Sequence, residues 1–168
     1  YGKFDVTVNP LISLWGFSHY NHSKLIVPTK EEIDSVLDFV GNDKYTLLPE
    51  KIKKHNPNVK FDFNAIAKGA AVDFIATYLK NLGFYSFMVE IGGEIVVSGL
   101  NKDDSLWRIG IVHPDKINDK LINAINLSNI AIATSGTYEN FFYINDNKYS
   151  HIIDPETGHP VEHDLVSV

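Results

Sequence analysis

The sequence ATSGTYENFFYINDNKYSHIIDPETGHPV, residues 133–161, is the stretch around which this chain is organised. It combines short apolar runs with turn-forming and polar residues, a pattern typical of small strands that frame a polar site. We expect a buried strand at residues 131–134, a break at Ser135-Gly136, a hairpin formed by 141–144 and 149–153, and a sharp turn at 154–158.

His151 lies on the second predicted strand of this hairpin, three residues before Asp154. An imidazole titrates near neutral pH. Held on a rigid strand beside a carboxylate and hydroxyls, it can serve as a general base toward a hydroxyl group. The alternative is a surface hairpin with an incidental histidine, and the stretch by itself leaves both open.

Composition indicates one globular domain over residues 1–168, since 44% of its 168 residues are hydrophobic and 12% aromatic. A net charge of −6 without a dense basic stripe argues against a nucleic-acid partner and against an anionic-membrane surface. The absence of cysteine excludes disulfides, thiolate catalysis and cysteine zinc sites. No stretch approaches the roughly 20 apolar residues of a membrane span.

The two ends of the sequence read as cuts. No signal peptide precedes Tyr1, and the apolar run 165–168 resembles a strand that stops midway. We therefore expect a domain truncated at both ends.

The pattern of the remaining elements predicts an α+β fold with a largely antiparallel sheet and packed helices. Thr29 and Glu32 form a capping box, so a helix should start there, bury Ile33, Val36, Leu37 and Val40, and stop at Gly41. A second helix should follow residues 64–71, bury Ala71, Ile75, Tyr78, Leu79 and Leu82, and end at Gly83. We expect a short helix or buried loop at 11–17, strands at 45–48, 59–63, 87–91, 95–97, 107–112 and 121–127, and a basic loop beside 51–54.

Two glycine-rich or small-residue segments have two interpretations each. Gly92-Gly93 interrupts a strand, which allows either close approach of a ligand or a plain bulge. Residues 64–71 pass from strand to helix, where free amides and carbonyls can face a ligand, or where small residues simply pack closely. The histidines other than His151 have no paired metal-ligand spacing, and we interpret them as loop or surface residues: His19, His22, His55, His113, His159 and His163.

Five segments, in order along the chain, resemble the ApbE family of FAD:protein FMN transferases. They are 4–17, with Asn9 where glycine is usual, DFNAIAKG at 62–69 with Asp73, EIGGEI at 90–95, TSGTYE at 134–139 and SHIIDPETGHP at 150–160. The resemblance covers nearly the whole chain, and it implies an ApbE-like, T-fold-related domain.

The resemblance implies a Mg²⁺-dependent transfer of FMN from FAD to a threonine or serine hydroxyl of a target protein, with release of AMP. FAD is then a substrate, His151 the general base, and the main-chain carbonyl of Ala65 a magnesium ligand. The positions that line up with FAD contacts, or that we expect to approach FAD closely, are Lys3, Phe4, Asp5, Asp62, Lys68, Gly92, Gly93, Ser135, Gly136 and Ile153. Binding of FAD without transfer, or its hydrolysis to FMN and AMP, are the alternative functions.

The sequence departs from the family at the magnesium site. An aspartate and a threonine of a C-terminal Asp-Ala-Leu-x-Thr-like motif complete that site in the family, and residues 1–168 contain no such motif. Asp154 and Thr157 belong to the preceding motif. Family context implies an electron-transfer flavoprotein as acceptor, an extracytoplasmic location in the periplasm or on the outer face of the cytoplasmic membrane, and membrane attachment through a lipid anchor alone.

Overall fold

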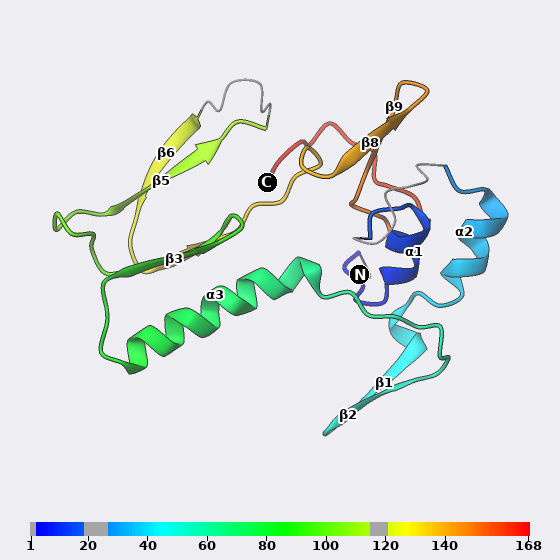
Figure 1. The fold of residues 1–168 in the computed structure, drawn as a ribbon, viewed down its shortest axis with the longest axis horizontal. Coiled ribbons are helices and arrows are strands. Elements are labelled where there is room, and N and C mark those ends of the chain that lie inside the picture. Colours follow the sequence, from blue (N-terminus) through cyan, green and yellow to red (C-terminus); the bar gives the residue numbers. More distant parts are fainter. Residues whose placement is uncertain (1–2, 19–26, 115–120) are drawn as a thin grey trace. The chain divides into compact units, whose positions relative to one another are not determined.

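The structure is a computed structural model that describes residues 3–18, 27–114 and 121–168 (Figure 1). The chain forms two compact units, unit 1 from residues 1–63 and 137–165, and unit 2 from residues 64–136 and 166–168. Each unit combines helix with antiparallel strands, which confirms the predicted α+β class. A single domain over the whole chain stays a prediction. None of the described helices is long and apolar enough to cross a membrane.

The core of unit 1 lies between two short helices, α1 (Asn9–Leu14) and α2 (Lys30–Leu37). The predicted capping box is confirmed, because the Glu32 amide donates to Thr29 Oγ1 at 3.3 Å and the Thr29 amide donates to Glu32 Oε2 at 2.8 Å. Leu11, Trp15 and Ile33 are almost fully buried. The helix ends at Leu37, earlier than Gly41, and a turn carries the chain to Gly41, whose φ is +137°.

Two hairpins complete unit 1. The first joins β1 (Tyr45–Leu48) to β2 (Lys51–Lys54) after a 3₁₀ turn at Asn42–Lys44. The predicted strand at 45–48 is confirmed, and residues 51–54 form its partner strand, which the sequence did not predict. The second joins β8 (Phe141–Ile144) to β9 (Asn147–Ser150). The predicted hairpin is therefore confirmed, but its second strand starts two residues earlier than predicted.

The predicted strand at residues 59–63 is wrong. Val59 is fully buried, but Phe61 and Asp62 are only half-buried, and the segment joins no sheet within the described ranges. Its Asp62 amide donates to the Val6 carbonyl at 2.7 Å, but no strand pairing is found there among the described residues. Alternation of apolar and polar residues does not make a strand where no neighbouring strand offers its backbone.

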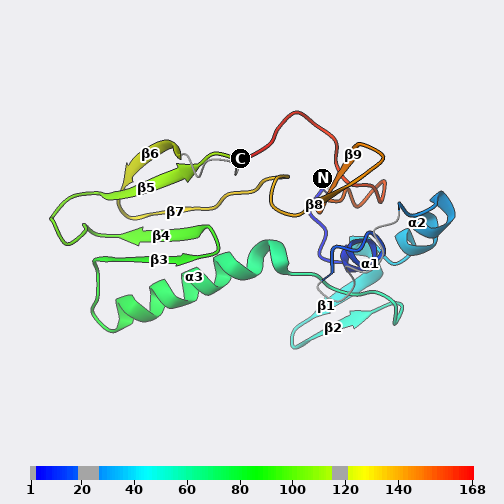
Figure 2. The ribbon, with the colours of Figure 1, turned by 45° about the horizontal axis from the view of Figure 1, so that its top comes forward.

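Unit 2 is a long helix on an antiparallel sheet. Helix α3 (Asn64–Asn81) packs on β3 (Phe87–Ile91) and β4 (Glu94–Ser98), and β7 (Ile130–Ile132) pairs with the far side of β4 (Figure 2). A second pair joins β5 (Trp107–Val112) to β6 (Leu121–Leu127). The predicted strand at 87–91 is confirmed, with Phe87 and Val89 buried and Met88 and Glu90 exposed.

Helix α3 buries a different face from the predicted one. Val72 and Ala76 are buried with Leu79 beside them, whereas Ile75, Tyr78 and Leu82 are exposed. The helix is apolar around most of its circumference, so periodicity alone does not select the side that meets the sheet. The smaller side chains face β3 and β4, where they allow close approach.

Gly92 and Gly93 form the two-residue turn between β3 and β4. Both have positive φ, +55° and +96°, and Ile91 pairs with Glu94 across the turn. Glycine adopts these angles without a steric cost, so a tight turn explains the double glycine without a bulge. The strand predicted at 131–134 is also corrected, because β7 spans Ile130–Ile132 and none of its residues is fully buried.

Candidate functional site

The predicted site residues fall into two groups, one in each unit. Unit 1 holds Lys3, Phe4, Asp5, Asp62, His151 and Ile153, and unit 2 holds Ala65, Lys68, Gly92, Gly93, Ser135 and Gly136. Of the other histidines, His19 and His22 lie outside the described residues.

His151 directly follows β9 and does not lie within it, which corrects the predicted strand position. Its amide donates to the Asn140 carbonyl at 3.0 Å, and its ring Nδ1 lies 3.0 Å from the same oxygen. A carbonyl only accepts, so Nδ1 carries the proton and Nε2 is the basic atom of the neutral ring. The Phe17 ring flanks the imidazole with its centroid 6.4 Å away. This arrangement suits a general base with a fixed tautomer.

A rigid turn follows His151. The Gly158 amide donates to the Asp154 carbonyl at 2.8 Å, and the Asp154 amide donates to the His159 carbonyl at 2.9 Å. Gly158 has a φ of +72°, and its carbonyl accepts from Trp15 Nε1 at 2.8 Å. The turn is thus tied to the buried core of unit 1, and the predicted sharp turn is confirmed.

Lys3 is paired with this turn. Its ammonium lies 2.9 Å from Asp154 Oδ2 and 2.7 Å from Glu156 Oε2. The hydrogen bond from Lys3 lowers the pKa of Asp154 below its ordinary value, while the bonds to Glu156 and Asp154 raise the pKa of Lys3. The lowered pKa of Asp154 stabilises the folded protein above the unfolded pKa near 3.8, and this stabilisation is lost on acidification. The raised pKa of Lys3 also stabilises the folded protein, and this stabilisation is lost at strongly alkaline pH.

Asp5 has a structural position. Its side chain is buried, and Oδ1 accepts from the Thr7 amide at 2.7 Å and from Thr7 Oγ1 at 2.6 Å. Thr7 Oγ1 in turn accepts from the Gly41 amide at 2.7 Å. Phe4 beside it is 56% exposed and so offers a ring face to a ligand. The early segment thus combines an internal hydrogen-bond network with one accessible aromatic ring.

Replacing Asp5 with alanine is expected to destabilise the protein by about 2–4 kcal/mol, because two buried groups of Thr7 lose a charged acceptor. Asp5→Asn keeps an oxygen at Oδ1 and serves as the matched control, with a loss of less than half that size. Urea unfolding gives both values. Unchanged stability of Asp5→Ala together with weaker FAD binding would assign Asp5 to the ligand instead.

The two other FAD-contact candidates of unit 1 differ in exposure. Asp62 is half-buried, at the segment whose amide is tied to Val6. Ile153 is buried in the core cluster with Leu11 and Phe142. Its side chain faces the protein interior, so a ligand contact from this residue would have to come from its backbone.

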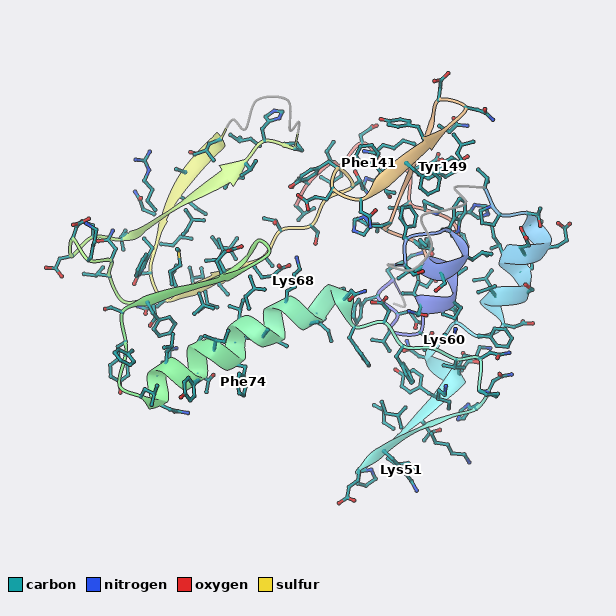
Figure 3. The ribbon with its side chains drawn as sticks, in the orientation of Figure 1. Lys51, Lys60, Lys68, Phe74, Phe141 and Tyr149 are labelled. Carbon is teal, nitrogen blue, oxygen red and sulfur yellow. The ribbon has the colours of Figure 1, made fainter. Side chains whose placement is uncertain are left out.

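Lys68, on helix α3, is the charged residue among the predicted site residues of unit 2 (Figure 3). Its ammonium lies 2.6 Å from Glu94 Oε2 and donates to the Gly92 carbonyl at 2.8 Å. A Cβ on Gly92 would lie 3.2 Å from Lys68 Cδ, so the glycine also makes room for the lysine side chain. Glu94 was not among the predicted site residues. Its only signal in the sequence is an acid directly after the double glycine.

The remaining backbone candidates of unit 2 are engaged within the protein. The Gly93 amide donates to Glu90 Oε1 at 2.7 Å. Ser135 exchanges backbone hydrogen bonds with Val168, at 3.0 and 2.8 Å, and Gly136 forms a bridge with Ser167. Close ligand approach at these positions stays a prediction.

A pocket of about 230 Å³ lies between the first turns of α3 and the strands β4 and β7. Its walls are mainly apolar, and Asp73 and Glu94 are its acidic residues; the lining residues are Gly69, Val72, Asp73, Glu94, Ile95, Val96, Ala131, Ile132 and Ala133.

The described residues do not by themselves form a magnesium site. They contain no group of three or more histidine, aspartate or glutamate side chains that could hold a metal ion. Ala65 lies in the first turn of α3, where helical geometry directs its carbonyl toward the Gly69 amide. Asp154 is already paired with Lys3. One neutral carbonyl is too weak a donor set for Mg²⁺, which prefers carboxylates, phosphates and water.

Comparison with known proteins adds independent information. The chain is 42% identical over 167 residues to the FAD:protein FMN transferase of Vibrio cholerae, covering 99% of this chain and 50% of that protein. It is 40% identical to the protein of the same name from Haemophilus influenzae, covering 99% of this chain and 49% of that protein. The chain therefore spans about half the length of these relatives.

Solved structures agree with this similarity. The flavin transferase ApbE from Vibrio cholerae matches with a TM-score of 0.84 and 41% identity, over 99% of this chain and 52% of that one. The ApbE protein from Thermotoga maritima matches with a TM-score of 0.87 and 34% identity, over 99% and 53%. The family profile described as the ApbE family matches residues 1–168. The chain belongs to the ApbE family.

Proposed function

We propose that this chain carries the catalytic histidine of an FAD:protein FMN transferase. The observation that supports this most is the fixed tautomer of His151, whose Nδ1 is held by the Asn140 carbonyl and whose Nε2 is thereby the basic atom. Relatives of 40% and 42% identity carry this activity in their names. A hydroxyl is a poor nucleophile until a base removes its proton, and we assign that step to His151.

The reaction proposed is attack of a threonine or serine hydroxyl of an acceptor protein on the FMN-side phosphorus of FAD. A new P–O bond forms to the acceptor, the pyrophosphate P–O bond breaks, and AMP leaves. His151 takes the hydroxyl proton at Nε2. Lys68 supplies positive charge toward the phosphates in a protein with a net charge of −6.

We propose that the transfer depends on Mg²⁺, which would offset negative charge on the phosphates of FAD. Phosphate oxygens of FAD and bound water are donors that Mg²⁺ favours, and they would add to the carbonyl of Ala65. We expect Mg²⁺ to bind this chain measurably only when FAD is present. Calorimetric titration with and without FAD checks this, and equally tight binding in the absence of FAD would contradict it.

The acceptor and location follow from family context alone. We propose an electron-transfer flavoprotein as acceptor, an extracytoplasmic location, and attachment of the protein to the membrane through a lipid. Fractionation of cells that produce the natural protein, followed by detection of flavin on acceptor proteins, tests both points.

Lys68→Met is expected to weaken FAD binding by about 10- to 100-fold, because the proposal assigns the lost charge to the phosphates. Riboflavin has no phosphate, so its affinity should not change. Lys80→Met, an exposed lysine at the other end of α3, is the matched control. Fluorescence titration gives the dissociation constants, and an equal loss for riboflavin and FAD would remove Lys68 from phosphate binding.

Release of AMP distinguishes transfer from the alternatives. With acceptor present, transfer gives AMP in step with flavin bound to the acceptor. Hydrolysis gives AMP and free FMN without acceptor, and an FAD-binding protein leaves FAD intact. Chromatography of the nucleotides before and after addition of acceptor separates these outcomes.

A further inference from the structure

The hairpin β1–β2 carries positive charge in an otherwise acidic chain. Residues 44–60 contain five lysines and one glutamate, a net charge of +4, while the whole chain carries −6. The remainder therefore carries −10. The net charge of the whole chain does not show that positive charge is concentrated in residues 44–60. For this reason the net charge argued against binding to an anionic membrane surface.

The turn end of the hairpin is apolar and uncovered. Leu47 is 69% exposed, Ile52 46% and Leu48 39%. Leu47 pairs with Ile52 on one face of the hairpin, while Leu48 pairs with Lys51 and therefore lies on the other face. Apolar side chains thus emerge on both faces at the turn. Figure 1 shows this turn as the end of the hairpin farthest from α1 and α2.

The base of the hairpin, in contrast, is firmly held. His55 connects it on three sides, with its amide donating to the Lys44 carbonyl at 2.9 Å, Nδ1 2.8 Å from the Asp43 carbonyl, and Nε2 2.8 Å from Thr46 Oγ1. Lys54 donates to the carbonyls of Pro57 and Val59, at 3.0 and 2.8 Å. These contacts fix a projecting hairpin that packs little of its own apolar surface. Two-stranded hairpins exposed on both faces are only marginally stable in water, and contacts among the described residues do not cover the apolar tip.

The lysines behind the tip are available for binding. Within the described part of the chain, Lys51, Lys53 and Lys60 have no ion-pair partner, and all three are exposed. Figure 3 labels Lys51 on the hairpin and Lys60 on the segment that follows it. An apolar tip backed by lysines is the arrangement that enters the headgroup region of a bilayer, where apolar atoms reach the acyl boundary and ammonium groups meet lipid phosphates. A protein partner that docks on one face would leave the apolar residues of the other face in water.

We propose that the β1–β2 hairpin binds an anionic lipid surface, with Leu47, Leu48 and Ile52 inserted and Lys51, Lys53 and Lys60 on the headgroups. The screening length is about 10 Å at 0.1 M salt. The charges of the hairpin therefore interact with the lipid headgroups more strongly than the negative charges of the rest of the chain do. Binding at this surface is independent of flavin transfer. It revises the expectation that membrane contact depends on a lipid anchor alone.

Cosedimentation of the purified protein with vesicles tests this, using equal parts of phosphatidylglycerol and phosphatidylcholine and, for comparison, phosphatidylcholine alone. We expect binding to the anionic vesicles only. Lys51→Glu with Lys53→Glu should weaken it at least about tenfold, and Leu47→Ser with Ile52→Ser about fivefold or more. Glu50→Lys, at the turn, should strengthen it. Lys80→Glu with Lys102→Glu makes the same charge change elsewhere and should alter it little.

Three results would overturn the proposal. The first is absence of binding to anionic vesicles, and the second is undiminished binding by Lys51→Glu with Lys53→Glu. The third is tight binding of polyglutamate that is weakened by the lysine substitutions but not by Leu47→Ser with Ile52→Ser. This result would identify an acidic polypeptide as the partner. Far-UV circular dichroism of each variant confirms that these exposed substitutions leave the fold intact.

Discussion

Replacing His151 with alanine is expected to lower flavin transfer by about 10²- to 10⁴-fold while FAD binding changes little. The ring is fixed by the Asn140 carbonyl at Nδ1 and flanked by Phe17, so its contribution is a correctly oriented base at Nε2. Loss of a base that acts in the transition state lowers the turnover number far more than it changes substrate affinity. Single-turnover transfer and FAD titration measure the two effects separately.

His163→Ala is the matched control, since His163 is an exposed histidine in the same unit. It should transfer flavin at the unaltered rate. Full activity of His151→Ala would remove this residue from the mechanism. An equal loss of FAD binding and of transfer would instead give His151 a ligand-binding role.

Gly158→Ala is expected to destabilise the protein by about 2–4 kcal/mol, from overpacking and from a left-handed backbone angle. A Cβ at this position would lie 2.5 Å from Ile33 Cγ2 and 3.2 Å from Leu11 Cδ2, two almost fully buried side chains that have no free space to move. Its φ of +72° adds backbone strain for any residue with a Cβ. Urea unfolding followed by circular dichroism gives the free energy.

Gly83→Ala separates the two causes. Gly83 has a φ of +87°, but a Cβ there would meet nothing within 4 Å. It should therefore show only the backbone cost, about 1–2 kcal/mol. If Gly158→Ala is no more destabilising than Gly83→Ala, the packing of the turn against Ile33 is not what holds the segment after His151 in place.

Local sequence signals predicted the elements whose causes are local. The capping box of Thr29 and Glu32 and the strand at 87–91 each depend on residues a few positions apart, and both are confirmed. Helix α3 shows the limit of such signals. Its apolar residues surround most of the helix, and only the sheet it meets decides that Val72 and Ala76 are buried while Tyr78 is exposed.

The candidate site shows the same division. His151 was identified from its motif, but its hydrogen bond to Asn140 depends on the hairpin, whose second strand starts earlier than predicted. Lys3 meets Asp154 across 151 positions of sequence, which no spacing argument can foresee. The pairing of Lys68 with Glu94 likewise needs the turn that brings β4 back beside α3. Contacts of this kind arise from tertiary packing, so sequence patterns give the residue types without their partners.

Covalent attachment of flavin to an acceptor is the most direct test of the proposed function. The protein is incubated with FAD, Mg²⁺ and an acceptor that carries a reactive threonine, and the acceptor is separated by denaturing electrophoresis. We predict flavin fluorescence on the acceptor with wild-type protein, its loss in His151→Ala, and its retention in His163→Ala. Unchanged FAD, or free FMN and AMP with no flavin on the acceptor, would contradict transfer as the function of this chain.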